Sequence, residues 1–390
     1  MFYIANEDDI RNGRVMDVYF ERASQILKAK GLSKYVAMEI RTKGLPAGWE
    51  WAIFSGLEEI LELLKGKPVD VRAIPEGTLF APYDPVMEIQ GNYTDFGSYE
   101  TEILGLMCQA SGIATNSARI KLAAGFKPVF SFGARRMHPA IAPMIERSAY
   151  IGGCDGVSVV LDAEKIGIEP SGTIPHAFIL LVGDTVKSAV YFDEMIDKEV
   201  PRLILIDTFN DEKFEAINVA EALKDRLYGI RLDTPGSRRG NMAQIVKETK
   251  WELDLRGHKG VKVMVSGGLD ENKVKELEEF VDLFGIGTYI SNSPVVDFAM
   301  DIVEIEHRPF AKRGKESGRK TLSRCKECGL RTVSAYPANT AACRACGGGL
   351  EEIMRPVMKN GRIVADLPPA GRIRDHVLNE IKKNSVKEKR

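Results

Sequence analysis

Short apolar runs that end in Asp, Ser, Thr or Gly recur through the middle of the chain. Four of them, each given with the polar or glycine residue that follows it, are Leu203–Asp207, Gly229–Asp233, Val263–Ser266 and Phe284–Gly287. Each run has the length of a strand, and three of the four are followed by a stretch with helical spacing. Strands that alternate with helices in this way predict a parallel βα array, whose chemistry gathers where the strands end.

The same alternation extends over residues 113–292 and predicts a catalytic α/β domain there. The expected strands are Val129–Phe132, Gly156–Val160, Ala177–Leu181, Leu203–Ile206, Gly229–Leu232, Val261–Val265 and Leu283–Ile286. Their starts lie roughly 20–30 residues apart, which is the size of one βα unit. The fingerprint Gly-x-Gly-x-x-Gly is absent, so a Rossmann domain is not favoured. The spacing leaves open whether the array closes into a barrel.

The first 112 residues mix strands with helices and predict an α+β domain. The expected strands are Val36–Arg41, Val71–Gly77 and Val86–Tyr93, and the expected helices are Gly56–Leu64 and Tyr99–Ser111. The later segment Pro294–Lys320 is interpreted as a return to this domain, because Val296–Glu306 is apolar on one side. We therefore expect three domains: residues 1–112 with 293–320, residues 113–292, and residues 321–390.

Charge is distributed unevenly along the 390 residues. From Arg308 to Arg390 there are 20 Lys and Arg against 8 Asp and Glu, whereas the rest of the chain carries 34 against 47. A basic region can attract nucleic acid or another anion, but it can also dock on the acidic remainder of its own chain, and we favour the second interpretation. No apolar run approaches the ~18 residues of a membrane span, and the N-terminus lacks a signal-peptide core. We expect a cytoplasmic protein.

Four cysteines form two closely spaced pairs. Cys325 and Cys328 make one Cys-x2-Cys pair, Cys343 and Cys346 make the second, and 14 residues separate them. Two such pairs suit a tetrahedral thiolate site for Zn²⁺. An iron site is one alternative, and disulfides are another that a reducing cytosol disfavours. Because four protein ligands close the site, we expect structural zinc.

Two predicted strand ends are rich in glycine and carry a hydroxyl side chain. They are Ser266-Gly267-Gly268 and Gly285-Ile286-Gly287-Thr288. Backbone N–H groups beside a helix N-terminus suit a phosphate. Another strand end presents Arg135 and Arg136, whose guanidinium groups pair with carboxylates or phosphates in bidentate geometry. These features predict an enzyme that handles a phosphorylated small molecule.

Seven motifs occur in order along the chain, and together they resemble the nicotinate phosphoribosyltransferase family. They are Phe130–Pro139, Gly153–Gly156, Gly172–Ala177, Ile206–Thr208, Arg231–Gly240, Ser266–Asp270 and Gly285–Thr288. The cysteine pairs make the chain similar to the short archaeal members that carry a C-terminal zinc ribbon. The resemblance covers nearly the whole chain. It implies a type II phosphoribosyltransferase fold, which is an irregular α/β barrel with an α/β sandwich domain and a small C-terminal zinc-ribbon-like domain.

The resemblance also implies a reaction in NAD biosynthesis or salvage. Nicotinate and 5-phosphoribosyl 1-pyrophosphate (PRPP) would give nicotinate mononucleotide and pyrophosphate, coupled to ATP hydrolysis through a phosphohistidine. His176 stands in the family's Gly-Thr-x-x-His context and would accept the phosphoryl group; the alternative is a hydrogen-bonded core histidine. Mg²⁺ and ATP would act beside the structural Zn²⁺.

For the PRPP end of the site, the resemblance implies a cradle of backbone amides around the 5-phosphate. Asp233 would hold the ribose hydroxyls or Mg²⁺, and Asp207 is a weaker candidate for the same role; a helix N-cap is the alternative for each. The remaining residues expected to contact PRPP are Arg136, His138, Arg231, Arg238, Arg239, Ser266, Gly267, Gly268, Gly287 and Thr288. The resemblance leaves open which arginine binds pyrophosphate and which binds a carboxylate.

For the nicotinate end, the resemblance implies Tyr19, Phe132, Arg135 and Asp155. Phe132 would stack on the pyridine ring, and Arg135 would pair with the carboxylate. Tyr19 would cover the ring from a neighbouring subunit, unless it simply packs in a core. The resemblance therefore implies a homo-oligomer with shared active sites, either a dimer or a trimer of dimers.

One loop departs from the pattern of the longer relatives. They carry Asp-Ser-Gly-Asp where this chain has Asp233-Thr234-Pro235-Gly236, so sugar and Mg²⁺ contacts can differ there. The alternatives are a decarboxylating quinolinate phosphoribosyltransferase, a nicotinamide-specific enzyme and another barrel enzyme for a phosphorylated sugar. A nucleic-acid-binding protein acting through the ribbon is disfavoured, because Tyr336 is the only aromatic residue near it.

Overall fold

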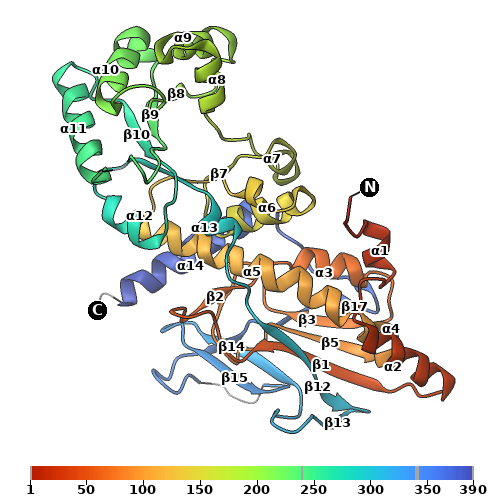
Figure 1. Cartoon of the computed structure of the whole chain (residues 1–390). Helices are drawn as coiled ribbons and strands as arrows, with labels where there is room; N and C mark the ends of the chain where they lie inside the picture. The colour runs from red at the N-terminus through yellow and green to blue at the C-terminus, as the bar shows by residue number, and fades with distance from the viewer. Residues whose placement is uncertain (1, 239, 339–341, 389–390) are drawn as a thin grey trace. The chain divides into compact units, whose positions relative to one another are not determined.

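A computed structural model describes residues 2–238, 240–338 and 342–388 (Figure 1). The chain divides into two compact units. Unit 1 comprises Met1–Thr115 and Pro294–Glu380, and unit 2 comprises Asn116–Ser293 and Ile381–Arg390. Pro294 and the residues after it, up to Glu380, belong to unit 1. That unit also includes the cysteine module.

A seven-stranded antiparallel sheet forms the framework of unit 1. In spatial order its strands are β13 (Arg308–Pro309), β12 (Phe298–Ile305), β1 (Tyr35–Thr42), β5 (Met87–Asn92), β3 (Asp70–Ala73), β17 (Arg355–Lys359) and β18 (Arg362–Ile363). The apolar segment expected after Pro294 is therefore a strand, β12, and it pairs directly with β1. A two-stranded sheet, β2 (Ala52–Ile53) with β4 (Leu79–Phe80), completes the N-terminal segment.

One face of the large sheet is apolar, because alternate residues of each strand point to the same side. Met38, Ile40, Val71 and Ile89 share one buried core with side chains of two helices. The helices are α3 (Leu57–Leu64) and α5 (Glu100–Ala123), which Figure 1 shows on the same side of the sheet. The expected helix Tyr99–Ser111 is thus the first half of a longer one.

The start of α3 touches α5 closely, and only a glycine fits there. Gly56 has φ +99°, and a Cβ added to it would lie 2.3 Å from the carbonyl oxygen of Leu106. The other helices of this segment are α1 (Glu7–Arg11), α2 (Val18–Ala29) and α4 (Tyr93–Phe96).

The opposite face of the sheet carries charged side chains that are nevertheless buried. Glu39 of β1, Arg72 of β3 and Glu88 of β5 each expose 5% of their surface or less. A second, three-stranded antiparallel sheet supplies their partners. Its strands are β15 (Arg331–Ala335), β14 (Lys320–Cys325) and β16 (Leu350–Glu352).

Ion pairs join the two sheets. Arg319, directly before β14, donates to Glu88 at 2.7 Å, and Arg72 pairs with both Glu88 and Glu352. The ring of Tyr336 lies 3.6 Å from the guanidinium carbon of Arg72 and 4.5 Å from that of Arg319. The cysteine module is therefore attached to unit 1 through compensated buried charge.

Unit 2 contains a six-stranded parallel sheet. In spatial order its strands are β7 (Gly156–Val157), β6 (Val129–Ser131), β11 (Leu283–Ile286), β10 (Lys262–Val265), β9 (Gly229–Leu232) and β8 (Leu203–Leu205). Strands that follow one another in sequence are neighbours throughout, except that β7 does not pair with β8. The array is therefore a half-barrel that is open between β7 and β8.

One strand predicted in the segment between β7 and β8 is wrong. Ala177–Leu181 was expected as a strand but lies in a helix, α8 (His176–Val182). A short apolar run fits either structure. Here Pro175 precedes the first turn, and Gly183 (φ +80°) ends the helix in a left-handed cap. These two end residues favour a helix over a strand.

Helices alternate with the strands of unit 2, except that three helices, α7 (Val160–Ile166), α8 and α9 (Thr185–Met195), lie in succession between β7 and β8. The others are α6 (Ala142–Ile151), α10 (Glu212–Leu223), α11 (Met242–Leu255), α12 (Glu271–Leu277) and α13 (Thr288–Ser291). The side chains of Asp184, Asp211, Asn241 and Asp270 cap four of them at their N-termini. The last helix of the chain is α14 (Ala370–Glu388). None of the helices in the described ranges has the length and hydropathy that crossing a membrane requires.

The charged face of the sandwich sheet leads to a stability prediction. Glu88→Ala removes the carboxylate shared by Arg72 and Arg319 and leaves buried positive charge uncompensated, so we expect the free energy of unfolding to fall by about 3 kcal/mol or more. Glu62→Ala is the control, because its ion pairs with Lys65 and Arg11 are both exposed and should each contribute less than about 1 kcal/mol. Chemical denaturation measures both variants. Equal losses would show that the buried layer has no special role.

Candidate active site

The alternation of side chains along the strands of the half-barrel gathers one set of residues on its inner face. Leu205, Arg231, Met264 and Leu283 stand at matching positions of β8, β9, β10 and β11. Two residues further along each strand, side chains return to the same face and the same height. The residues at that level are Asp207, Asp233, Ser266 and Gly285. The strand ends predicted to carry chemistry therefore converge.

Asp207 links two of these positions. Its side chain is almost fully buried, Oδ1 lies 3.1 Å from Nε2 of His176, and Oδ2 accepts a hydrogen bond from the backbone N–H of Asp233 at 2.7 Å. His176 is the first residue of α8 and remains partly exposed. Asp207 thus holds a histidine whose ring still reaches the surface.

Arg231 is the centre of the cluster. Its Nε donates to Ser266 Oγ at 3.0 Å, Nη1 to Thr173 Oγ1 at 2.8 Å, and Nη2 to Asp233 Oδ2 at 3.0 Å. The ring of Phe132 lies 5.4 Å from the guanidinium carbon, within the range of a cation–π contact. Burial lowers the pKa of Arg231, and the carboxylates of Asp233 and Asp207 oppose that shift.

Ser266 completes the network and starts a glycine turn. Its hydroxyl donates to Asp233 Oδ1 at 2.9 Å. Gly267 (φ +82°) and Gly268 (φ +63°) follow, and both have the left-handed backbone that glycine adopts without strain. A Cβ added to Gly268 would meet no atom within 4 Å, so the turn borders open space. His176, Asp207, Asp233, Arg231 and Ser266 form one continuous chain of hydrogen bonds.

The neighbouring strand end brings a second glycine turn and an aromatic ring. Gly285 makes room for Phe132, because a Cβ at position 285 would lie 2.6 Å from the ring. Gly287 caps α13 and is followed by the exposed Thr288. Since β10 and β11 are adjacent parallel strands, the turns at Gly268 and Gly287 lie at the same edge of the sheet.

Two arginines follow β6 at this edge. Arg135 and Arg136 stand on a 3-10 turn, Ala134–Arg136, and both are exposed. The charge of Arg135 contributes to lowering the pKa of Arg231, so Arg135 lies near the cluster. His138 is also exposed, and its Nδ1 accepts a hydrogen bond from the N–H of Ala140, a local turn contact. Arg238 is exposed in the turn after β9, and Arg239 lies outside the described residues.

Asp155 is not brought into the cluster. It precedes β7, and its carboxylate accepts hydrogen bonds from Lys121 Nζ at 2.5 Å and from the N–H of Val129 at 2.8 Å. Both contacts lie at the amino end of the sheet, opposite the glycine turns. In this structure Asp155 compensates the buried charge of Lys121 and ties α5 to β6.

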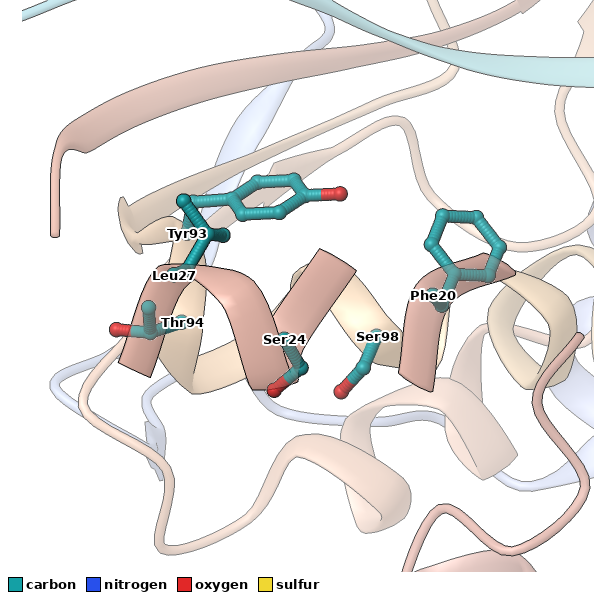
Figure 2. A pocket seen from close by; sticks show the side chains of 6 residues that line it. All are labelled: Phe20, Ser24, Leu27, Tyr93, Thr94 and Ser98. Atoms are coloured by element: carbon teal, nitrogen blue, oxygen red, sulfur yellow. The ribbon is translucent and has the colours of Figure 1, made fainter. Parts of the chain in front are cut away.

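Tyr19 belongs to unit 1. It stands on α2 and is more than half exposed, and its hydroxyl donates to Asp17 at 3.3 Å. The next residue, Phe20, points inward to a cavity of about 10 Å³ that Ser24, Ser98 and Tyr93 also line (Figure 2). Room for about one water molecule is present there. Tyr19 itself faces outward.

Two further residues were not predicted, Thr173 within the cluster and Glu146 on the outer side of the sheet. Thr173 lies in a quoted motif, but its contact with Arg231 joins positions 58 residues apart. Glu146 of α6 is fully buried and accepts hydrogen bonds from Ser131 Oγ and the N–H of Ser158, both at 2.7 Å. Burial raises the pKa of Glu146 to about 7. A charged residue on a helix carries no sequence signal for such a position.

The four predicted metal ligands form a compact group. The Sγ atoms of Cys325, Cys328, Cys343 and Cys346 all lie within 4.8 Å of one another. Two pairs of sulfurs are 3.4 and 3.6 Å apart, close to the ~3.8 Å edge of a tetrahedron with 2.3 Å Zn–S bonds and far above the ~2.05 Å of a disulfide. The donor set and geometry fit structural zinc.

Comparison with known proteins agrees with this architecture. Residues 17–111 match the N-terminal domain and residues 113–301 the C-terminal domain of quinolinate phosphoribosyl transferase. The nicotinate-nucleotide pyrophosphorylase of Pyrococcus furiosus is 54% identical, covers 98% of each chain and superposes with a TM-score of 0.96.

Two more distant proteins share the fold or much of the length. The human nicotinic acid phosphoribosyltransferase superposes with a TM-score of 0.79 at 18% identity, over 94% of this chain and 93% of its own, which is a likeness of fold alone. A nicotinate phosphoribosyltransferase of Mycobacterium tuberculosis is 27% identical over 400 aligned residues, which cover 90% of this chain and 83% of the relative.

The cysteine geometry predicts about one zinc ion per chain, since four thiolates complete its coordination. Plasma emission spectroscopy of the purified protein measures the content. Cys325→Ser should lower both the zinc content and the melting temperature, because metal binding stabilises the fold that holds it. Cys108→Ser, at a half-buried cysteine outside the cluster, should retain the metal. A wild-type protein without stoichiometric zinc would contradict the assignment.

The raised pKa of Glu146 predicts a pH dependence of stability. Its contribution is fully present below the ordinary value of 4.5 and is lost as the pH rises through about 7. Glu146→Gln removes that titration. Relative to wild type, the variant should therefore gain on the order of 2 kcal/mol of unfolding free energy between pH 5 and pH 8. Urea unfolding at both pH values tests this, and parallel profiles would contradict it.

Proposed function

Because the chain belongs to the family of quinolinate and nicotinate phosphoribosyltransferases, type II enzymes of NAD biosynthesis, we propose that it joins nicotinate to PRPP. The products are nicotinate mononucleotide and pyrophosphate, and ATP hydrolysis drives the reaction. The observation that carries the proposal is the continuous network from His176 to Ser266 beside two glycine turns.

Two observations favour nicotinate over quinolinate. The matches to the quinolinate enzyme's two domains end at residue 301, whereas the similarity to the mycobacterial nicotinate enzyme spans 90% of this chain. Quinolinate phosphoribosyltransferase remains the second candidate. It is favoured by the similarity to the Pyrococcus furiosus nicotinate-nucleotide pyrophosphorylase.

The two glycine turns suit the phosphate of PRPP. In barrels of parallel strands, backbone amides after the last strands commonly bind phosphate, and here Gly267, Gly268, Gly287 and Thr288 occupy that place. Asp233, between the turns and Arg231, is placed to bind the ribose hydroxyls. Asp233 and substrate oxygens would hold Mg²⁺, a cation that prefers carboxylate and phosphate ligands.

The residues of the site act mainly by position and charge. When pyrophosphate leaves the anomeric carbon, positive charge develops on the sugar and negative charge on the leaving group. Asp233 stabilises the positive charge on the sugar. The exposed guanidinium groups of Arg136 and Arg238 stabilise the negative charge on the pyrophosphate. Phe132 and Arg135 hold the pyridine ring and its carboxylate in line with the sugar. Arg231 keeps Phe132 and Asp233 in place.

His176 would accept the phosphoryl group from ATP. With Asp207 accepting from Nε2–H, the lone pair of the imidazole lies on Nδ1, which is then the nucleophilic nitrogen. The arrangement of a carboxylate that orients a histidine supports nucleophilic catalysis. Asp207, whose two oxygens contact His176 and the N–H of Asp233, orients these two residues and remains the weaker candidate for holding the sugar or Mg²⁺.

A neighbouring copy would complete the site. Tyr19 is exposed on unit 1, and the same unit contains a groove of about 880 Å³ with Lys43, Lys312, Arg313 and Lys315 among its lining residues. Lys312 and Lys315 both pair with Asp301, which holds this positive charge in place. An exposed tyrosine suits a pyridine ring of a partner subunit and a basic groove suits its phosphates, so we propose a homodimer or a trimer of dimers.

A panel of substrates tests the proposed function. The full-length protein with Mg²⁺ and PRPP is supplied with nicotinate, nicotinamide or quinolinate, with and without ATP, and products are separated by chromatography. We expect nicotinate mononucleotide, a preference of at least about tenfold over nicotinamide because the amide leaves an arginine unpaired, and a higher rate with ATP. Release of CO₂ from quinolinate would instead favour the second candidate.

His176→Ala separates the two half-reactions. We expect the variant to lose stimulation by ATP and to retain the slower, ATP-independent transfer, because the ribosyl site is intact. His258→Ala is the control, since His258 precedes β10 at the other end of the strand. ATP stimulation that persists in His176→Ala would remove the phosphohistidine from the scheme.

A further inference from the structure

The buried carboxyl group of Glu146 joins the ends of two strands. Ser131, whose hydroxyl donates to Oε1, is the last residue of β6, and Ser158, whose N–H donates to Oε2, directly follows β7. β7 is an edge strand that pairs with β6 over two residue pairs only. So short a strand is weakly held by its ladder. The two bonds to Glu146 therefore supply much of its attachment.

The hydrogen bond between Ser131 and Glu146 helps to position Phe132. Side chains of consecutive strand residues point to opposite faces, so Ser131 faces Glu146 on the outer side while Phe132 faces the inner side. There the ring of Phe132 packs with residues of neighbouring strands and lies against the guanidinium of Arg231. Because Ser131 and Phe132 are consecutive, the hydrogen bond that holds Ser131 on the outer face also fixes the position of Phe132 on the inner face.

The hydrogen bond between Ser158 and Glu146 helps to position Thr173 through β7. The carbonyl oxygen of Val157 accepts a hydrogen bond from the N–H of Ser171 at 2.7 Å. A Cβ added to Gly156 would lie 2.2 Å from Ser171 Oγ, so this segment fits closely on β7. Two residues later, Thr173 accepts the hydrogen bond from Arg231 Nη1. The position of β7 therefore sets the position of Thr173.

We propose that Glu146 is a positioning residue that holds Phe132 and Thr173 against Arg231 and thereby shapes the pyridine-binding end of the site. The assignment of that end to a pyridine ring rests on the proposed function. Two of the four contacts of Arg231 depend on strand ends that Glu146 joins. The other two, with Asp233 and Ser266, depend on β9 and β10, beside the glycine turns.

This division predicts a split between the two substrates. Loss of Glu146 should loosen the pyridine end and leave the PRPP end in place. A matched control is available in Asp162 of α7, another buried carboxylate, whose oxygens have no hydrogen-bond partner within the described part of the chain. Its removal takes away a buried acid without releasing a strand end.

The test compares Glu146→Ala, Glu146→Gln and Asp162→Ala in the full-length protein. Initial rates at varied nicotinate and varied PRPP give KM for each substrate. We expect Glu146→Ala to raise KM for nicotinate about tenfold or more, because small displacements of positioning groups are costly, and to change KM for PRPP less than about twofold. Glu146→Gln, which can still bond Ser131 and Ser158, should stay within about threefold of wild type, and Asp162→Ala should match it.

Hydrogen–deuterium exchange provides a readout that does not need activity. Glu146→Ala should speed amide exchange in residues 130–136 and 168–174, which lie outside α7, and Asp162→Ala should not. Equal changes in both KM values, or unchanged exchange in these two segments, would overturn the positioning role. A wild-type protein that converts no pyridine base would refute the proposed function instead, and the exchange experiment would then decide the role of Glu146 alone.

Discussion

Parallel strands with matched registers bring side chains from distant parts of the sequence to one face and one height, and the candidate site depends on this constraint. Asp207, Asp233 and Ser266 are separated by 26 and 33 residues, yet hydrogen bonds connect them in series. Each stands two residues beyond a set of positions that the strand registers align. The sheet thus brings these three side chains together.

The site is also organised around a buried positive charge. Arg231 loses solvation on burial, and the structure replaces the lost water with one carboxylate, two hydroxyl groups and an aromatic face. A cation fixed in this way cannot move far, and its partners are fixed with it. Such preorganised charge is what stabilising an ionic transition state requires. Arg135 and Arg136, on the turn that follows β6, are exposed and can bind an incoming anion.

Much of this arrangement could be predicted from sequence, because strand ends, glycine turns and paired cysteines are local signals. The failures occurred where a tertiary contact decides. Ala177–Leu181 is apolar enough for a strand, but its caps make it a helix. The role expected for Asp155 at the nicotinate end stays a prediction, and its carboxylate lies at the amino edge of the sheet, opposite the glycine turns. Thr173 contacts Arg231 and Glu146 contacts Ser131, and no local sequence pattern predicts either contact. The cysteine spacing predicted the metal site but not the buried charges that attach its module.

A crystal structure with nicotinate mononucleotide bound is the most direct test that these strand ends form a phosphoribosyltransferase site. We expect the phosphate within hydrogen-bond distance of the amides of Gly268 and Gly287, the ribose beside Asp233 and the pyridine ring against Phe132. A nucleotide bound on another surface, with the Arg231 cluster unoccupied at saturating ligand, would contradict this expectation.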